Sequence, residues 1–206
     1  MPTSPRFWNL IAGRYARTPV ADEAAYQHKL AATRHLLSPE MDVLEFGCGT
    51  GTTALHHAPF VRRYTGIDFS PKMIAIARDK ATAAGQSNLS FEVARIEEWT
   101  APDHSYDVIL GMSILHLLDG KEAVLARVHR LLKPGGLFVS STVCATDMPR
   151  IVTWILPVGS ALGLLPLVRR FSDSDLVASH IDAGFVIKDR WRPGPGKAVF
   201  LVAQVP

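Results

Sequence analysis

The stretch Val43-Leu44-Glu45-Phe46-Gly47-Cys48-Gly49-Thr50-Gly51 decides the fold of this chain. A short apolar run leads directly into a glycine-rich loop, and a helical pattern follows over residues 52–58. In a doubly wound sheet, a turn of this kind from strand to helix binds a nucleotide-like ligand, and its glycines let the backbone approach that ligand closely. The stretch therefore predicts a ligand site at the end of the first strand.

Outward from this loop, short apolar runs alternate with helical segments, after an aromatic-rich arm over residues 7–20. Strand, helix and strand in series require right-handed crossovers, and so a largely parallel sheet with helices on both faces. The expected strands are 43–46, 64–67, 89–94, 106–111 and 137–142, and the expected helices are 22–37, 52–58, 71–84 and 121–132.

The last part of the chain breaks this rhythm. A helix over 173–183 precedes strands at 185–191 and 198–203, which the turn Pro193-Gly194-Pro195-Gly196 joins. Because so short a turn cannot hold a crossover helix, we expect these two strands to pair antiparallel. The predicted fold class is α/β: a Rossmann-like, doubly wound, seven-stranded, mostly parallel sheet with an antiparallel last hairpin.

The composition limits the class of protein. A chain of 206 residues suits one domain, residues 1–206, and its 48% hydrophobic and 20% charged residues are typical of a globular protein. The net charge of +3 is spread in pairs such as Arg62-Arg63, which argues against a nucleic-acid partner. Two cysteines give no disulfide framework and no metal site, and the start of the chain has no secretory signal, so we expect a cytoplasmic protein without a metal.

A second motif, Gly66-Ile67-Asp68, ends the second strand and places a carboxylate beside the glycine loop. Its position suits hydrogen bonds from ribose hydroxyls, although an Asp at a strand end also serves as a helix cap. Ser70, directly before Pro71, is the better cap candidate. Thr52 stands where a dinucleotide fingerprint has Gly or Ala, so the loop reads GxGxG and not GxGxxG.

With these motifs in place, the chain resembles the class I S-adenosylmethionine-dependent methyltransferases of the small-molecule, methyltransferase domain 11/25 type. The resemblance covers about three quarters of the chain. It rests on four stretches in order: Val43 to Leu55, Gly66 to Met73, Tyr106 to Leu118 and Leu125 to Val139. It implies S-adenosylmethionine as the cofactor and S-adenosylhomocysteine as the product.

The resemblance also implies roles for residues at matching positions. The glycine loop would cradle the methionine part and the ribose, the acid before the loop would reach the methionine amino group, and the acid after strand two would bind ribose. Two further side chains would pack the adenine ring, although one of them, Met73, fits an ordinary core contact equally well. These residues are Gly47, Cys48, Gly49 and Gly51, then Glu45, then Asp68, then Phe69 and Met73.

One position departs from the family pattern. Where the family often has an Asp or Asn that reaches the adenine amino group, this chain has Arg95. The backbone N–H of Ile96 and the side chain of Glu97 remain as polar partners for the ring.

The loop that follows the fourth strand should border the transferred methyl group. Gly111 and Met112 begin this loop, and Gly111-Met112-Ser113-Ile114 lacks the Asn/Asp-Pro-Pro-aromatic sequence of enzymes that methylate base amino groups. His116 is the titratable candidate for a general base there, with a structural histidine as the alternative. His56 and His57 are adjacent on a helix and point apart, so they make no metal pair.

Two segments are expected to cover the site. In similar enzymes an arm like residues 1–38 folds over the cofactor, and Tyr15 and Tyr26 lie in it, with core packing as the alternative for both. An apolar cap insertion is expected at 143–171. Its charge-free core, 151–168, would barely span a membrane and contains two prolines and two glycines, so two short helices are favoured over a span.

The cap leaves three interpretations open: a lid over an apolar acceptor, a contact with a membrane surface, or a dimer contact through 148–171. The function predicted is methyl transfer to a small, hydrophobic acceptor at O, N, S or C. The alternative is a non-catalytic protein that binds S-adenosylmethionine or S-adenosylhomocysteine. A nicotinamide-dependent oxidoreductase is the third reading, and Thr52 argues against it.

Overall fold

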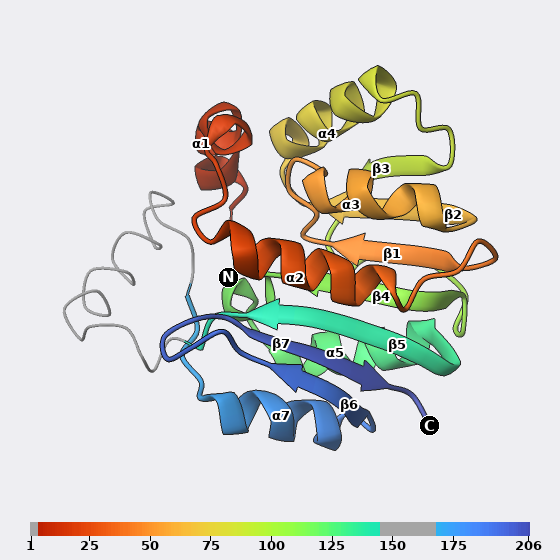
Figure 1. Ribbon diagram of the computed structural model, residues 1–206, viewed down its shortest axis with the longest axis vertical. Helices are drawn as coiled ribbons and strands as arrows, with labels where there is room; N and C mark the ends of the chain where they lie inside the picture. Colours follow the sequence, from red (N-terminus) through yellow and green to blue (C-terminus); the bar gives the residue numbers. More distant parts are fainter. Residues whose placement is uncertain (1–3, 145–167) are drawn as a thin grey trace.

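The computed structural model describes residues 4–144 and 168–206, and in these ranges it has a seven-stranded sheet with helices on both faces (Figure 1). The strands are β1 (Asp42–Phe46), β2 (Arg63–Asp68), β3 (Leu89–Val93), β4 (Tyr106–Met112), β5 (Leu132–Thr142), β6 (Val186–Trp191) and β7 (Val199–Gln204). The helices are α1 (Arg6–Arg17), α2 (Glu23–Arg34), α3 (Thr52–His57), α4 (Pro71–Ala83), α5 (Lys121–Leu131) and α7 (Asp173–Asp182), with short 3-10 helices η1 (Ala58–Phe60) and η2 (Leu115–Leu117).

The strand order of the sheet is β3-β2-β1-β4-β5-β7-β6. Strands β1 to β5 pair in parallel, whereas β7 pairs antiparallel with both β5 and β6. The order reverses between β1 and β4, which are neighbours although two strands separate them in sequence. The sheet confirms the predicted fold class, including the antiparallel last hairpin.

Each face of the sheet has its own hydrophobic core, because alternate residues of a strand point to opposite faces. Leu44 and Phe46 of β1 pack toward α5 and α7, and Val43 packs toward α3 and α4. The helices bring matching apolar stripes: Val124, Leu125, Val128 and Leu131 on α5, and Ile74, Ala77 and Ala81 on α4. Burial on both faces is the reason that these strands are almost continuously apolar.

Side-chain caps fix where two helices begin. The Asp22 carboxylate accepts a hydrogen bond from the Ala25 N–H at 3.1 Å, and the Ser70 hydroxyl accepts one from the Met73 N–H at 3.2 Å. Pro71 occupies the first turn of α4, where its missing N–H is no loss. Ser70 is therefore the cap of α4, as expected.

Two segments differ in detail from the sequence-based expectation. The arm is itself helical, since α1 occupies residues 6–17 and one of its residues, Ala12, is fully buried. Lys133-Pro134-Gly135-Gly136 does not precede β5 but lies within it as an irregularity, because Tyr106 pairs with Leu132 and Val108 with Leu137. The expected strand begins only at residue 137, and the proline and glycines before it shift the register of the pairing between β4 and β5.

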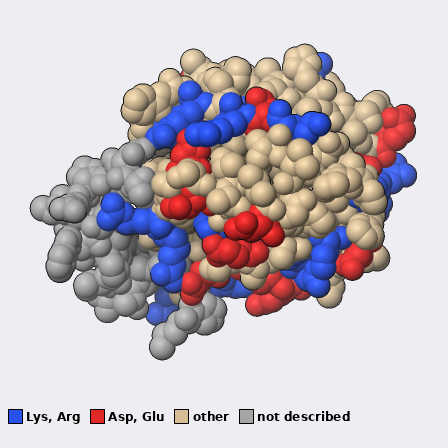
Figure 2. Space-filling model, turned by 90° about the horizontal axis from the view of Figure 1, so that it is seen from below, with Lys and Arg blue, Asp and Glu red and all other residues tan. Residues whose placement is uncertain are grey.

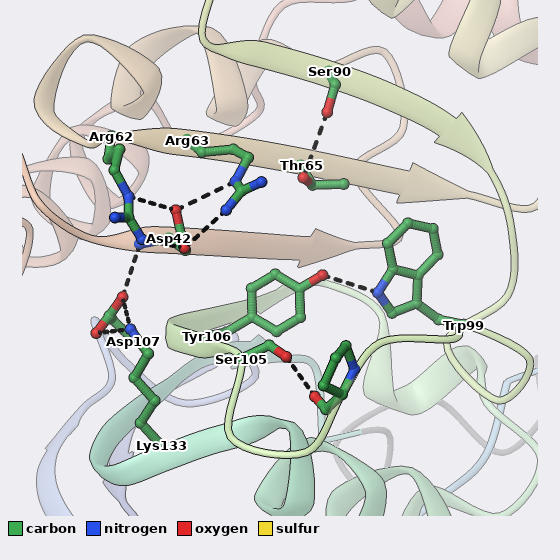
Figure 3. Close-up of polar contacts among 11 residues, drawn as sticks. Asp42, Arg62, Arg63, Thr65, Ser90, Trp99, Ser105, Tyr106, Asp107 and Lys133 are labelled. Atoms are coloured by element: carbon green, nitrogen blue, oxygen red, sulfur yellow. Dashed lines mark hydrogen bonds and ion pairs between the residues drawn. The ribbon is translucent and has the colours of Figure 1, made fainter.

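A network of charges joins the amino ends of the central strands, at the edge opposite the glycine loop (Figure 3). The Asp42 carboxylate accepts hydrogen bonds from both Arg62 and Arg63, and its backbone N–H donates to Asp107 at 2.8 Å. Lys133 in turn contacts Asp107 at 2.8 Å. These contacts lower the pKa of Asp42 despite its burial and connect β1, β2, β4 and β5.

The central part of the expected cap, residues 145–167, lies outside the described residues. Among those described, 4–144 and 168–206, no helix is both long and apolar enough to cross a membrane. The expectation of one domain over 1–206 stays a prediction.

Candidate active site

The carboxyl ends of β1 and β4 are neighbours in the sheet, and the loops after β1, β2, β3 and β4 surround a cavity there that α1 covers. We call it the switch-point cavity. The loops contribute Phe46, Gly47 and Gly49; Asp68, Phe69 and Met73; Ala94, Arg95, Ile96 and Glu97; and Met112, Ser113, Ile114, Leu117 and Leu118. The arm contributes Ser4, Phe7, Trp8 and Tyr15.

The glycine loop needs its glycines for packing as well as for space at the cavity. Gly47 and Gly51 have φ angles of 64° and 74°, in the left-handed region that L side chains rarely adopt. A Cβ at Gly47 would lie 2.7 Å from a side-chain carbon of Ile114, and one at Gly51 would lie 2.6 Å from the Phe91 ring. Gly51 is buried and does not line the cavity, so its role is to let the loop turn against β3 and α4.

Asp68 joins the glycine loop to the end of β2. One carboxylate oxygen accepts a hydrogen bond from the Gly49 N–H at 3.0 Å, and the other accepts one from the Ser70 N–H at 2.8 Å. Burial raises the pKa of Asp68, and these two N–H donors oppose the rise. The carboxylate is thus fixed at the cavity wall with lone pairs left to accept hydroxyl donors.

Glu45 lies beneath the loop and does not line the switch-point cavity. Its side chain is fully buried on the α3 and α4 side of the sheet, where the Tyr64 hydroxyl donates a hydrogen bond to it at 2.8 Å. Burial raises the pKa of Glu45 to about 8, against the effect of that hydrogen bond. In the protein without ligand this carboxyl is therefore mostly protonated at neutral pH.

The residues after β2 and β3 form an aromatic and polar wall. Phe69 and Met73 both line the cavity. Met73 is 2% exposed and so has the core contact expected of it, and its contact with an adenine ring stays a prediction. The Arg95 guanidinium lies over the Phe69 ring, 4.7 Å from its centre. Ile96 and Glu97 line the same wall, and Arg127 Nε donates a hydrogen bond to the Ile96 carbonyl at 2.8 Å.

The loop after β4 supplies the wall where the methyl group is expected. Met112 and Ser113 line the cavity, and Ser113 has a φ angle of 56°, which is uncommon for a residue other than glycine. The Ser113 N–H donates to the Ser141 carbonyl at 2.7 Å and so ties this loop to β5. Gly111 is buried behind the wall, where a Cβ would lie 2.8 Å from the Phe46 ring.

His116 lies in η2 and does not line the cavity, although its neighbours Leu117 and Leu118 do. Its carbonyl accepts a hydrogen bond from the Arg169 N–H at 2.7 Å. Its ring Nδ1 is buried without a hydrogen-bond partner among the described residues. Burial lowers the pKa of His116 to about 4, so the imidazole is uncharged at physiological pH.

The two tyrosines of the arm lie at different places. Tyr15 lines the switch-point cavity and its ring covers the glycine loop, since a Cβ at Gly49 would lie 3.8 Å from it. Tyr26 and Cys48 line a second cavity on the other side of Tyr15, which Arg14 also borders. Burial raises the pKa of both tyrosines and of the Cys48 thiol, so all three are protonated at neutral pH.

Several residues at the site were not predicted from the sequence. Phe7 and Trp8 line the cavity, and Asn9 holds α1 against the start of α4, because its side-chain oxygen accepts hydrogen bonds from the Ser70 hydroxyl at 2.7 Å and the Lys72 N–H at 3.3 Å. The helical spacing of Trp8, Ala12 and Tyr15 was the available signal, since these residues share one side of a helix. Tyr64, the partner of Glu45, carried no such signal.

Comparisons with known proteins agree with this geometry. Residues 43–136 match the family model described as a methyltransferase domain. A demethylmenaquinone methyltransferase from Tropheryma whipplei is 30% identical over 148 residues, which is 70% of this chain and 59% of that protein. The Arabidopsis thaliana phosphoethanolamine N-methyltransferase 3 is 36% identical over 52% of this chain and 22% of its own length. The chain therefore spans less than two thirds of either relative.

Solved structures with the same fold include a Haloferax volcanii methyltransferase in complex with the activator Trm112, at a TM-score of 0.77 and 20% identity, with 98% of both chains covered. The [4+2]-cyclase SpnF follows at a TM-score of 0.74 and 23% identity, covering 92% of this chain and 84% of its own. At such identities the likeness concerns the fold. Together with the family match over residues 43–136, these comparisons confirm the expected resemblance to methyltransferases.

Proposed function

We propose that this chain, whose residues 43–136 match the methyltransferase domain family, transfers a methyl group from S-adenosylmethionine to a small, hydrophobic acceptor. The observation that carries the proposal is the meeting of the Asp68 carboxylate and the glycine loop at one wall of the switch-point cavity. S-adenosylhomocysteine would be the product.

The residues around the cavity fit the parts of the cofactor. Asp68 would accept hydrogen bonds from the ribose hydroxyls, and the Gly47 and Gly49 backbone would lie along the ribose and methionine part. Phe69, Met73, Arg95, Ile96 and Glu97 would surround the adenine ring. Arg95, which already stacks on Phe69, would offer N–H donors to the ring acceptors in place of the acid that the family often has there.

The methionine end would lie toward Tyr15 and the second cavity, which Tyr26 and Cys48 line. Glu45, beneath the loop, would stabilise the methionine ammonium through the loop backbone and lose its proton as that positive charge approaches. Gly51 would serve this arrangement by letting the glycine loop pack against β3 and α4, and Gly111, near the end of β4, by letting β4 pack closely against Phe46; Met112 follows Gly111 and lines the cavity wall.

When bound, S-adenosylmethionine supplies a methyl group activated by a sulfonium centre. The main task of the protein is then to hold the acceptor in line and to exclude water. Water would be excluded by the apolar side chains that line the cavity: Phe7, Trp8, Ile114 and Leu117. The lining also supports an apolar acceptor, because it offers such an acceptor more partners than it would a highly charged one.

A proton has to leave only if the attacking atom carries one. We keep His116 as the candidate base, since its uncharged ring has an Nδ1 without a partner among the described residues. This role requires the loop after β4 to turn the imidazole toward the acceptor, because the ring does not line the cavity.

The test has two stages. Calorimetric titration of the purified chain with S-adenosylmethionine and with S-adenosylhomocysteine should give micromolar binding of both. Transfer of a labelled methyl group is then measured to a panel of reduced naphthoquinones, phenols and apolar amines, with phosphoethanolamine as the polar comparison suggested by one relative. Binding without transfer to any of them would favour a non-catalytic binding protein, and no binding of either ligand would reject the proposal.

We place this activity in the cytoplasm. Both cysteines, Cys48 and Cys144, are buried and neither forms a disulfide, which supports a reducing compartment. The acceptor rather than a macromolecule is the partner proposed at the cavity, and the use of residues 148–171 as a lid, a membrane contact or a dimer contact stays a prediction.

A further inference from the structure

Helix α1 has two sides with different partners. Trp8, Ala12 and Tyr15 face the body of the protein, where Ala12 is buried and the two aromatic rings line the switch-point cavity. Positions 6, 10, 14 and 17 fall on the other side at helical spacing. That side carries Arg6, Leu10, Arg14 and Arg17, and all four are exposed.

This outer side has charge of one sign only. Helix α1 contains three arginines and no acidic residue, and none of the three forms an ion pair with another described residue. Arg14 and Arg17 are three residues apart and so are neighbours on the helix surface, where like charges repel one another. An anionic partner would relieve this repulsion.

Several other surface cations of the protein have an acidic partner. On the face drawn in Figure 2, acidic and basic side chains lie intermixed. On β6 and just after it, Arg190 and Arg192 both contact Asp173, and Arg169 contacts Asp119. Asp42 forms ion pairs with both Arg62 and Arg63. The outer side of α1 differs from these places in having three arginines and no acidic residue beside them.

An apolar residue stands in the middle of the stripe. Leu10 is 78% exposed, and Phe7 beside it is partly exposed. A nucleic acid or a free phosphate offers nothing to a leucine that projects between arginines. A bilayer with anionic headgroups offers both partners, since phosphates attract the arginines and the acyl boundary accepts the leucine.

We propose that the outer side of α1, made of Arg6, Leu10, Arg14 and Arg17, docks this protein on the surface of an anionic lipid bilayer. In Figure 1, α1 lies beyond the carboxyl ends of the parallel strands, where the switch-point cavity is. Docking through α1 brings that cavity to the membrane surface, so an apolar acceptor dissolved in the bilayer reaches it without crossing water. The docking itself does not depend on methyl transfer.

The test uses vesicles and the whole chain. Sedimentation with vesicles of phosphatidylglycerol and phosphatidylcholine should bind the protein, vesicles of phosphatidylcholine alone should bind it at least about tenfold less, and 0.5 M salt should weaken the binding, since a basic residue near an anionic surface contributes roughly fivefold to partitioning. The triple variant Arg6→Gln, Leu10→Ser, Arg17→Gln should lose about twentyfold or more. These positions do not line either cavity.

A matched variant controls for charge and apolar surface. Arg130→Gln, Ile181→Ser, Lys188→Gln removes the same number of positive charges and one exposed aliphatic residue, since Ile181 is 56% exposed, and should bind like the wild type. Equal losses in both variants, no binding of the wild type to anionic vesicles, or equally tight binding to single-stranded DNA through the same residues would each overturn the proposal.

A single-site measurement avoids any dependence on the triple variant. Because Cys48 and Cys144 are buried and are the only cysteines of the chain, Leu10→Cys provides one exposed thiol for an environment-sensitive dye. Anionic vesicles should shift its emission to the blue, and the same dye at Ile181→Cys should not respond. A silent dye at position 10, with vesicle binding intact, would place the contact elsewhere and reject α1.

Discussion

The Gly49 N–H donates a 3.0 Å hydrogen bond to the Asp68 carboxylate, so the loop after β1 and the end of β2 are held together by the group that should also bind the cofactor ribose. A carboxylate in this position orders the site before any ligand arrives. Because the same carboxylate fixes the loop and should bind the ligand, a substitution at Asp68 changes both the loop geometry and the ligand contact.

Asp68→Asn keeps the size of the side chain and one acceptor but removes the charge. We expect binding of S-adenosylhomocysteine to weaken about ten- to hundredfold, because a hydrogen bond to a charged group is worth about 1.5–3 kcal/mol. Isothermal titration calorimetry measures the effect. Asp79→Asn, on the exposed side of α4, is the matched control and should bind normally. Equal affinities for the two variants would remove Asp68 from the site.

Two glycines separate backbone strain from packing. Gly51 and Gly85 have similar φ angles of 74° and 65°, but a Cβ meets the Phe91 ring at 2.6 Å in the first and nothing within 4 Å in the second. Gly85→Ala should therefore lower the free energy of unfolding by about 1 kcal/mol, from strain alone. Gly51→Ala should cost about 1–3 kcal/mol more, from overpacking. Urea denaturation distinguishes them, and equal losses would mean that the loop yields to the added methyl group.

The Glu45 carboxyl gives the ligand-free protein a pH-dependent stability. The pKa of Glu45 is about 8 in the folded protein, and the ordinary pKa of a glutamate, which applies to the unfolded chain, is 4.5. Between these two pH values the unfolded chain releases a proton that the folded protein keeps. The contribution is complete below the lower value and is lost as the pH rises through the upper one. From about pH 5 to about pH 8, the wild type should lose more than about 1 kcal/mol relative to Glu45→Gln. Denaturation curves that stay parallel across this range would contradict the burial of Glu45.

The depressed pKa of His116 predicts a histidine that stays neutral in mild acid. Its ring signal in proton NMR should titrate near pH 4, as should that of His57, which burial also shifts to about 4. His116→Gln assigns one signal and His57→Gln the other. Because both pKa values are lowered, their contribution to stability is present above about 6.5 and is lost as the pH falls toward 4. A His116 signal that titrates near 6.5 would mean that the ring reaches solvent.

Asp42 tests the charge network at the opposite edge of the sheet. Asp42→Asn weakens the contacts with Arg62 and Arg63 at a side chain that is only 8% exposed, and should lower the free energy of unfolding by about 1–3 kcal/mol. Asp103→Asn, at an exposed position, should have little effect. Affinity for S-adenosylhomocysteine should remain within about twofold in both, and a larger change would show that the two edges of the sheet are coupled.

The sequence predicts what periodicity and turn residues encode locally. The strands, the helix beginning at Ser70-Pro71 and the antiparallel hairpin follow from apolar runs and from a turn too short for a crossover, and the structure has them. The glycine loop and Asp68 meet because parallel strands end at one edge, so their proximity was also predictable.

Contacts that depend on register and orientation were not predictable. Glu45 finds the Tyr64 hydroxyl because β1 and β2 pair with Glu45 opposite Gly66, a relation that no local pattern states. His116 follows a loop that reaches the cavity, yet its ring does not line the cavity and its Nδ1 is buried. The next residue, Leu117, lines the cavity wall instead. The arm contains aromatic residues, but only its docking through Asn9 decides which of them cover the site.

The position of β7 has a consequence for how the protein forms during synthesis. Strand β6 is made before β7, yet β7 lies between β5 and β6 and is the strand through which β6 joins the sheet. On the ribosome, β6 therefore has no place in the sheet until β7 emerges, and the β5 edge stays open to any other strand in the meantime. The paired residues of β5 and β7 lie 57 to 67 positions apart in the sequence, from Thr142 with Val199 to Leu137 with Gln204. This edge should therefore be the last to form and the first point at which a chaperone protects the chain.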